Sequence, residues 1–170
     1  LKVGIKQLEY LSSNEFVIQE NSKSFIAEAF RSIRTNLQFF IRHQNKAKTF
    51  LVTSSISGEG KSFCSLNLAA IFALSGKKTI LVGCDLRKPK SMSHLGLKGE
   101  FGVTNYLIGS STEKQVIQTS GISNLDIILT GPKPPNPSEL LLTERIDELF
   151  AYLKEHYEYI VLDSPPLGLI

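Results

Sequence analysis

Two kinds of hydrophobic pattern alternate along the 170-residue chain. Short runs rich in Ile, Leu, Val and Thr are typical of strands that a parallel sheet buries on both faces. Longer segments with an apolar residue at every third or fourth position are typical of helices that bury one face. We predict strands at residues 49–54, 78–84, 125–129 and 159–162.

The first two helices have clear boundaries. One is predicted from Ser24 to about Ile41, and the other covers residues 61–75 and ends at Gly76. One face of the first helix is expected to carry its apolar residues: Phe25, Ile26, Ala29, Phe30, Ile33, Leu37 and Phe40.

The remaining segments are shorter or less regular. Helical spacing predicts short helices near residues 104–108 and 112–117, and a longer helix that runs from Pro137 to about His156. Proline suits the first turn of such a helix, because that turn needs no backbone N–H donor there. Loops are expected at residues 87–100 and 131–137.

Apolar strands that alternate with helices predict an α/β fold with a mostly parallel central sheet. The length fits one domain with a single core. Residues 1–22 are expected to be a lead-in strand or linker, and residues 23–170 the domain itself. Both ends of the chain look cut, and four or five strands are few for such a sheet. We therefore expect a C-terminally incomplete domain, truncated after the strand that ends at Asp163.

The composition is that of an ordinary soluble globular protein, with 42% hydrophobic and 21% charged residues. A net charge of +3, with scattered Lys and Arg, is too weak to indicate nucleic-acid binding. No apolar run reaches the roughly 18 residues of a membrane helix, and no signal peptide opens the chain. These features favour a cytoplasmic domain. Cys64 and Cys84 are expected to be small buried side chains.

A phosphate-binding loop is indicated by residues 55–62, which read SISGEGKS between a predicted strand and a predicted helix. Gly58 and Gly60 permit backbone angles that point N–H groups inward, and the helix N-terminus attracts phosphate. Lys61 would reach the terminal phosphates, and Ser62 would bind Mg²⁺. The expected fold is therefore a three-layer P-loop NTPase fold. The nucleotide-binding residues are expected to be Ser57, Gly58, Glu59, Gly60, Lys61, Ser62 and Phe63.

Two carboxylates follow predicted strands and are candidate ligands of the metal. Asp163 ends the strand at residues 159–162, and Asp85 ends the strand after the phosphate-loop helix. The carboxyl ends of parallel strands form the ligand-binding edge of such a sheet. We therefore expect Ser62, Asp85 and Asp163 to hold the metal, although aspartate also ends many strands without a chemical role.

Glu28, Arg31 and Arg34 are spaced three apart on the first predicted helix. They could form ion pairs within the helix, which contribute little energy. Alternatively, their arginine side chains could pair with carboxylates of another subunit.

Together these motifs resemble the bacterial tyrosine kinases of the capsule and exopolysaccharide type, whose catalytic domain is related to P-loop ATPases. The resemblance spans roughly residues 25–169. Its proline-rich stretch, GPKPPNPSELL, is more specific than the phosphate loop. The matching segments are residues 28–36, 58–62, 85–89, 131–141 and 162–166.

The resemblance implies an ATP-dependent tyrosine autokinase with Lys61, Asp85 and Asp163 as catalytic residues and with ATP and Mg²⁺ as cofactors. Lys61 and the metal would neutralise the transferred phosphoryl group. Asp85 or Asp163 would position or deprotonate a tyrosine hydroxyl from a neighbouring subunit.

The resemblance also implies a ring-like homo-oligomer assembled through Glu28, Arg31 and Arg34, which phosphorylation would loosen. A membrane-spanning polysaccharide co-polymerase, fused or separate, would activate the kinase. The domain would then lie at the inner face of the bacterial cell membrane and regulate polysaccharide chain length and export.

The chain departs from the family pattern at three points. Gly83 stands where the family usually has the first Asp of an Asp-x-Asp-x-Arg motif, and Ser57 stands where it commonly has Pro. The C-terminal tyrosine cluster that such kinases phosphorylate is not in this chain. Two other readings stay open: a non-catalytic nucleotide-binding adaptor of the export machinery, and a partitioning-type ATPase. Ile56 counts against the ATPase, because those proteins have a second Lys at this position.

Overall fold

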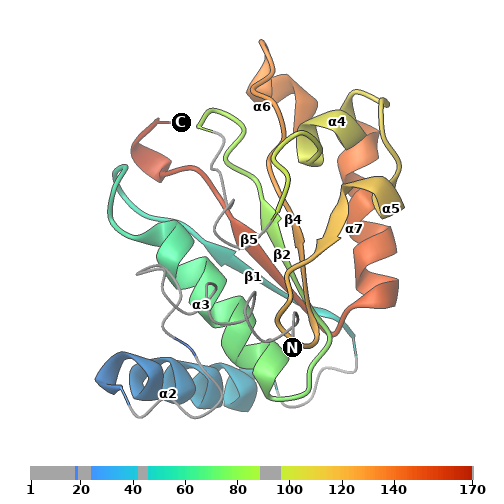
Figure 1. The fold of residues 1–170 in the computed structure, drawn as a ribbon. Coiled ribbons are helices and arrows are strands. Elements are labelled where there is room, and N and C mark those ends of the chain that lie inside the picture. The colour runs from blue at the N-terminus through green and yellow to red at the C-terminus, as the bar shows by residue number, and fades with distance from the viewer. Residues whose placement is uncertain (1–17, 19–23, 42–45, 89–96, 170) are drawn as a thin grey trace, which may run out of the picture.

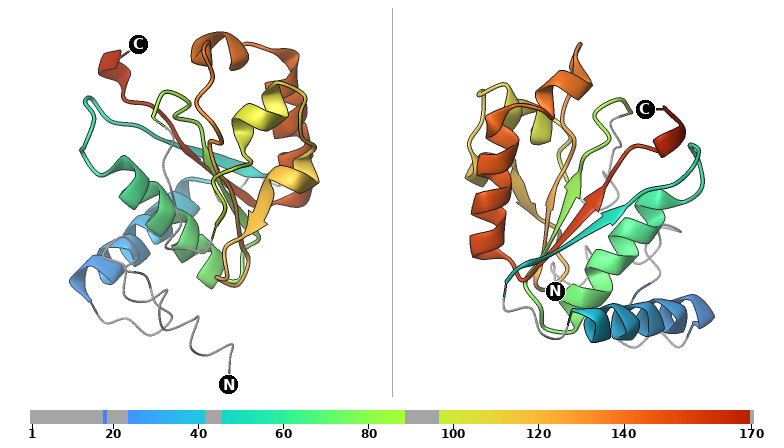
Figure 2. Two further views of the ribbon diagram at one scale, coloured as in Figure 1. Left: turned by 45° about the horizontal axis from the view of Figure 1, so that its top comes forward. Right: turned by 180° about the vertical axis from the view of Figure 1, so that it is seen from behind.

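A computed structural model of the chain describes residues 18, 24–41, 46–88 and 97–169 (Figure 1). Its centre is a five-stranded sheet in the order β1-β5-β2-β4-β3, with helices on both faces (Figure 2). β3 is antiparallel to β4, and the other four strands are parallel. This arrangement confirms the predicted α/β fold with a mostly parallel sheet. The strands are β1 (Lys48–Val52), β2 (Thr79–Gly83), β3 (Ile117–Thr119), β4 (Leu125–Ile128) and β5 (Tyr159–Asp163).

Helix α3 (Lys61–Leu74) covers one face of the sheet, and α2 (Phe25–Phe40) packs against α3 (Figure 1). Because α3 lies between the sheet and α2, every residue from Ser65 to Ala73 is buried, whichever side it faces. Aromatic rings join α3 to the sheet. Phe72 stacks on Tyr159, with ring centroids 4.2 Å apart, and on Phe50, with ring centroids 5.3 Å apart.

The opposite face carries a second apolar cluster. Leu149 and Leu153 of α7 are fully buried there against Ile80 and Ile160 of the sheet, together with Tyr106 of α4. The helices of this half are α4 (Val103–Leu107), α5 (Glu113–Val116), α6 (Pro137–Leu140) and α7 (Glu144–His156). The 3-10 helix η2 (Leu167–Leu169) follows β5 and lies beside the loop after β1, where the amides of Leu167 and Gly168 donate to the carbonyls of Ser54 at 2.9 Å and Ser55 at 3.0 Å.

The four predicted strands and the first two helices are confirmed, with small shifts at their ends. Ser24 caps α2, because its side-chain oxygen accepts a hydrogen bond of 3.1 Å from the Ala27 amide. Gly76 follows the end of α3 with a φ of 81°, a left-handed conformation that glycine adopts without strain.

The short helix predicted near residues 112–117 is confirmed as α5, with Thr112 as its N-cap, but the strand β3, which starts at Ile117 and pairs with β4, was not predicted. One prediction about the later helices is wrong. The helix predicted from Pro137 to His156 is two helices. Thr143 is extended, its hydroxyl donates to the Leu140 carbonyl at 2.8 Å, and it becomes the N-cap of α7. A threonine that hydrogen-bonds locally competes with helix continuation, which explains this break.

The predicted apolar face of α2 is buried only in part. Phe30 is buried and Leu37 half-buried, whereas Phe25 is 89% exposed and Phe40 81% exposed. In the isolated chain, α2 therefore keeps large apolar side chains at the surface.

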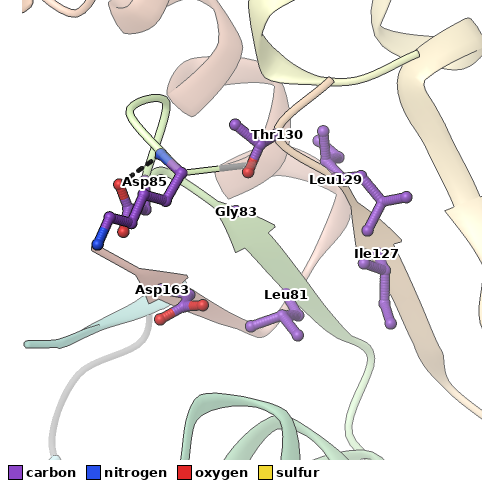
Figure 3. Close-up of a pocket in the computed structure, with 9 residues that line it drawn as sticks. Leu81, Gly83, Asp85, Ile127, Leu129, Thr130 and Asp163 are labelled. Atoms are coloured by element: carbon purple, nitrogen blue, oxygen red, sulfur yellow. Dashed lines mark hydrogen bonds between the residues drawn. The ribbon is translucent and has the colours of Figure 1, made fainter. Parts of the chain in front are cut away.

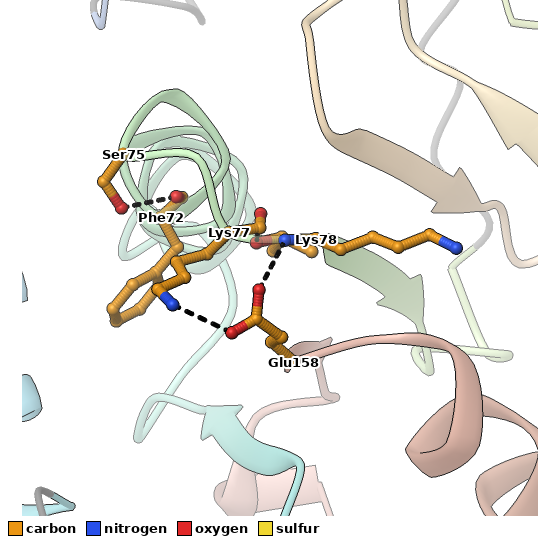
Figure 4. A network of polar contacts seen from close by, with 6 residues as sticks. Phe72, Ser75, Lys77, Lys78 and Glu158 are labelled. Carbon is orange, nitrogen blue, oxygen red and sulfur yellow. Dashed lines mark hydrogen bonds and ion pairs between the residues drawn. The ribbon is translucent and has the colours of Figure 1, made fainter.

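A polar network holds the end of the sheet that lies opposite the predicted phosphate loop (Figure 4). The Glu158 carboxylate, just before β5, accepts from Lys77 Nζ at 2.9 Å and from the Lys78 amide at 3.4 Å. The loop between α3 and β2 is thereby tied to the start of β5.

Two predictions fall on residues outside the described ones. They are the lead-in at residues 1–22, of which only Ile18 is described, and the central part of the loop at 87–100. Among the described residues, no helix is both long and apolar enough to cross a membrane.

Candidate functional site

The loop between β1 and α3 has the backbone that its sequence predicts. Gly58 has a φ of 92° and Gly60 a φ of 87°, in the left-handed region. No atom lies within 4 Å of a Cβ added at either position, so backbone conformation rather than space calls for glycine. Gly60 is also the N-cap of α3. The first-turn N–H groups of α3, which have no partners within the helix, therefore lie directly after the loop.

Glu59 restrains the loop through hydrogen bonds of its side chain, a contact that the sequence analysis missed. Its Oε2 accepts hydrogen bonds from the amides of Ser55 at 2.9 Å and Ile56 at 3.1 Å. The spacing of four and three residues could have indicated such a turn-closing carboxylate. The bonds are exposed, so their effect is local: they restrict the first half of the loop.

Lys61 and Ser62 begin α3 and lie beneath the loop. The Lys61 side chain is buried, with 7% of the residue exposed. The Ser62 hydroxyl donates a hydrogen bond to Asp163 Oδ2. Phe63, which was predicted to contribute to nucleotide binding, directs its ring elsewhere: it packs against Phe30 of α2, with ring centroids 6.1 Å apart.

Strand pairing explains why Asp163 reaches Ser62. Asp163 is the last residue of β5 and pairs with Val52 of β1 on one side and with Gly83 of β2 on the other. Because the phosphate loop starts just after Val52, the end of β5 lies beside it. The Asp163 residue is only 5% exposed, so its carboxylate lies in a site largely closed to water.

Asp85 lies on the same edge of the sheet, two residues beyond the end of β2 rather than at its last position. It is 8% exposed, and its Oδ1 accepts from the Lys88 amide at 3.3 Å. Asp85 and Asp163 line one small cavity (Figure 3). Nearby, Arg87 reaches toward Ser138 of α6, with 3.5 Å between Nη2 and Oγ.

The side chains at this edge suit a magnesium ion bound together with a phosphate ligand. Ser62, Asp85 and Asp163 offer oxygen atoms only, which Mg²⁺ prefers. The described residues contain no group of three or more His, Cys, Asp or Glu side chains that could hold a metal by themselves. Mg²⁺ characteristically binds one or two carboxylates and completes its shell with water and substrate phosphates, so two carboxylates and a hydroxyl fit it.

Thr130 is a further residue of this edge that the sequence analysis did not single out. It follows β4 by two residues, is 5% exposed and lines the same cavity as both aspartates. A Cβ added at Gly83 would lie only 2.9 Å from the Thr130 hydroxyl oxygen. The rule that identified Asp85 and Asp163, a polar residue just beyond a buried strand, could have identified Thr130 as well.

The prediction that both cysteines are buried is wrong for Cys64, which is exposed on α3, and holds only in part for Cys84, which is half-buried. Cys84 lies between Gly83 and Asp85. Burial, and then the negative charge of Asp163, raise the pKa of the Cys84 thiol to about 12. This thiol is therefore neutral at physiological pH and does not act as a nucleophile.

Glu28, Arg31 and Arg34 lie on α2, outside the cluster around the loop (Figure 1). Arg31 and Glu28 form an ion pair of 2.9 Å within the helix. The Arg34 Nε is buried and has no hydrogen-bond partner among the described residues. The structure thus brings Ser62, Asp85 and Asp163 together beside the loop. Glu28, Arg31 and Arg34 lie on a separate surface.

Comparison with known proteins gives consistent matches. The family described as an AAA domain matches residues 47–170. Tyrosine-protein kinase YwqD of Bacillus subtilis is 39% identical over 145 residues, which are 85% of this chain and 61% of that protein.

Solved structures agree with these matches. The kinase domain of Escherichia coli tyrosine kinase ETK superposes with a TM-score of 0.79 at 34% identity, over 84% of this chain and 56% of that chain. The chimerical protein CapA2B2 superposes with a TM-score of 0.85 at 33% identity, over 94% of this chain and 70% of that chain. The septum site-determining protein MinD of Pyrococcus horikoshii, solved with Mg-ADP, shares the fold at 21% identity with a TM-score of 0.60, over 71% of this chain and 49% of that chain.

Proposed function

Because this chain belongs to the bacterial tyrosine kinases built on a P-loop ATPase fold, we propose that it is the catalytic part of an ATP-dependent protein-tyrosine kinase that phosphorylates its own copies. The chain spans 61% of the B. subtilis relative. The observation that carries the proposal is the hydrogen bond from Ser62 to Asp163, since it joins the phosphate loop to a buried carboxylate.

The proposed roles follow from position. The loop residues Ser57 to Gly60 and the first amides of α3 surround the phosphates of ATP, with Lys61 bound to the terminal phosphate oxygens. A buried ammonium neutralises phosphate charge more strongly than an exposed one, because little water screens it. Phe63 contributes through its backbone, since its ring packs on α2.

Ser62, Asp85 and Asp163 are the proposed metal ligands. Mg²⁺, when bound, supplies positive charge that stabilises the phosphoryl group during transfer. Asp85 and Asp163 line one cavity, so either carboxylate can accept the proton of an incoming tyrosine hydroxyl while the other stays with the metal. The transfer then needs only positioning and charge neutralisation, as is usual for phosphoryl transfer.

The acceptor tyrosine is proposed to come from a neighbouring copy. Tyr106, Tyr157 and Tyr159 are buried in the core. Tyr157 donates to Asp126 at 2.8 Å, and burial raises the pKa of its hydroxyl well above the usual value. Within the described part of the chain, these three hydroxyls are therefore poor acceptors.

Self-association through α2 is the proposed assembly mode, in a ring that contains Glu28, Arg31 and Arg34. The exposed Phe25 and Phe40 support it, because large apolar side chains at a surface commonly mark a contact. Phosphorylation would add negative charge and loosen the ring. A membrane-spanning co-polymerase, fused or separate, is the proposed activator, which would place the domain at the inner face of the bacterial membrane, where it controls polysaccharide length and export.

Gly83 favours one alternative, a nucleotide-binding adaptor that assembles with ATP but transfers no phosphate. The family usually has aspartate there, and this chain has no side chain at that point. The domain extent also remains a proposal: residues 23–170 form the P-loop domain and residues 1–22 lead into it.

The test is an incubation of the full-length protein, together with its activating segment, with Mg·ATP. Phosphotyrosine is mapped by mass spectrometry, and Lys61→Ala serves as the matched control. We expect phosphotyrosine in the wild type and none in Lys61→Ala. Nucleotide binding without phosphotyrosine in the wild type would establish the adaptor instead, and unchanged nucleotide binding by Lys61→Ala would refute the phosphate-loop assignment.

A further inference from the structure

Three neighbouring strands end side by side at the edge of the sheet that carries the site. Gly83 of β2 pairs with Asp163 of β5, and Val82 pairs with Ile128 of β4. Thr130 follows Ile128 by two residues, so it lies on the other side of Gly83 from Asp163 (Figure 3). The position that usually carries an aspartate in this family is therefore flanked by a carboxylate and a hydroxyl.

Thr130 occupies the space that a side chain at position 83 would enter. A Cβ at Gly83 would lie 2.9 Å from Thr130 Oγ1, 3.1 Å from Thr130 N and 3.5 Å from the Ile128 carbonyl oxygen. The first separation is shorter than real Cβ contacts, so Thr130 would have to move before any larger residue could fit.

The backbone of Thr130 is held in place from the other side. The amides of Val103 and Thr104 in α4 donate to the carbonyls of Leu129 at 2.8 Å and Thr130 at 3.0 Å. At Gly102, a Cβ would lie 2.1 Å from the Leu129 carbonyl oxygen, which shows how closely α4 approaches. If a side chain is added at position 83, the overlap must therefore be relieved by a movement of the Thr130 side chain and not of its backbone.

The Thr130 hydroxyl is placed to act on the two carboxylates. Thr130 is only 5% exposed, and it lines a cavity that Asp85 and Asp163 also line. The cavity has a volume of about 10 Å³, close to the space that one water molecule needs. A hydroxyl can donate to and accept from such a water, whereas ionised carboxylates only accept.

We propose that Thr130 takes the place of the missing aspartate at position 83 by holding a water between its hydroxyl and the carboxylates of Asp85 and Asp163. Thr130 is thus a positioning residue that orients the two metal-binding carboxylates. Its side chain is neutral, whereas the family usually has a third negative charge at this place. This inference rests on the proposed function of the site as a Mg·ATP site.

The spatial part is tested without any ligand, by thermal unfolding of Gly83→Ala, Thr130→Ala and the double variant. We expect Gly83→Ala to lower Tm by roughly 5 °C, since overpacking at a rigid site is destabilising. In a protein that already carries Thr130→Ala, the substitution Gly83→Ala should lower Tm by less than half as much. Equal losses in both backgrounds would overturn the claim that Thr130 fills this space.

The chemical part is tested with Thr130→Val, which keeps the shape and removes the hydroxyl, and Thr130→Ser, which keeps the hydroxyl. The readout is the Mg²⁺ concentration that gives half-maximal binding of a fluorescent ATP analogue. Loss of a group that orients metal ligands typically weakens metal binding about 10- to 100-fold. We expect a shift of at least about tenfold for Thr130→Val and little for Thr130→Ser.

An unchanged Mg²⁺ requirement in Thr130→Val, or equal shifts in both variants, would overturn the proposed role of the hydroxyl. Phosphotyrosine formation by the wild type is scored in parallel. A wild type that binds Mg·ATP but forms no phosphotyrosine would refute the kinase function, while the binding readout still decides the role of Thr130.

Discussion

The Ser62 hydroxyl donates a hydrogen bond to the Asp163 carboxylate, although 101 positions separate the two residues in the chain. Ser62 begins the helix after the phosphate loop, and Asp163 ends the strand next to the strand that leads into that loop. This contact places a buried negative charge beside the helix N-terminus, where Mg²⁺ and the phosphates of ATP are proposed to bind.

Asp163→Asn should strongly reduce catalysis with little effect on the fold. The amide keeps the shape and can still accept from Ser62, but it removes the charge that attracts the metal. We expect phosphotyrosine formation to fall by about 10²-fold or more, and the Mg²⁺ requirement to rise. Steady-state kinetics over a Mg²⁺ series, together with thermal unfolding, measures both effects.

Asp147→Asn is the matched control, because Asp147 is an exposed carboxylate on α7, remote from the loop. It should leave the rate unchanged. Full activity in Asp163→Asn would exclude this carboxylate from the reaction.

Removal of the exposed phenylalanines of α2 should shift assembly toward the monomer. Burial of a large apolar side chain contributes about 1.5–3 kcal/mol. Phe25→Ser combined with Phe40→Ser should therefore raise the dissociation constant by about 100-fold or more. Arg31→Ala combined with Arg34→Ala should act in the same direction if these residues also lie in the interface.

Sedimentation velocity at several protein concentrations measures this change. Leu142→Ser is the control, since Leu142 is 86% exposed but lies between α6 and α7. If all variants sediment like the wild type, α2 is an ordinary surface of this protein.

The two cysteines should react at very different rates with iodoacetamide at pH 8. Cys64 is exposed, whereas burial raises the pKa of Cys84 to about 12. The reactive thiolate of Cys84 is then scarce until the pH approaches that value, so we expect alkylation of Cys84 to be at least about 100-fold slower. Peptide mass spectrometry follows both sites, and in urea their rates should converge. Equal rates in the folded protein would show that Cys84 is accessible.

The ion pair between Lys77 and Glu158 should contribute little to the stability of the fold, and only in a defined pH range (Figure 4). The hydrogen bond and charge of Glu158 raise the pKa of Lys77, and the hydrogen bond from Lys77 lowers the pKa of Glu158. The stabilisation from Glu158 is therefore fully present above its unfolded pKa of 4.5 and is lost as the pH falls through the lower, folded value. Likewise, the Lys77 contribution is present below 10.5 and is lost as the pH rises through its higher, folded pKa.

Because both side chains are nearly half exposed, the pair should stabilise the protein by less than about 1 kcal/mol. Glu158→Gln should lower Tm by at most about 3 °C at pH 7, and the difference should shrink below pH 4 and in 1 M NaCl. A difference that persists at low pH and high salt would show that charge is not its cause.

Local sequence signals determined much of the architecture. The apolar runs placed four strands, Ser24 marked the start of α2, and Gly76 marked the end of α3. The loop at residues 55–62 was recognisable because its glycines, lysine and serine must follow one another directly. In each case neighbouring residues carry the physical cause, whether strand burial, helix capping or glycine conformation.

Signals that depend on distant partners were missed or misread. Ile117 continues a helical spacing, but antiparallel pairing with Ile128 makes it the start of β3. The sequence pattern places Thr143 inside one long helix, but its hydrogen bond to the Leu140 carbonyl divides that segment into α6 and α7. The exposure of Phe25 and Phe40 was likewise hidden, because periodicity shows which residues share a face but not what covers it.

The sequence by itself determined which residues could perform the chemistry, namely Lys61, Ser62, Asp85 and Asp163, and the order of the strands that carry them along the chain. Only the tertiary structure decided that Ser62 touches Asp163 and that Thr130 fills the space beside Gly83. Those contacts depend on the order of strands across the sheet and on their register, which are set by packing between segments far apart in the chain and not by any pattern within one of them.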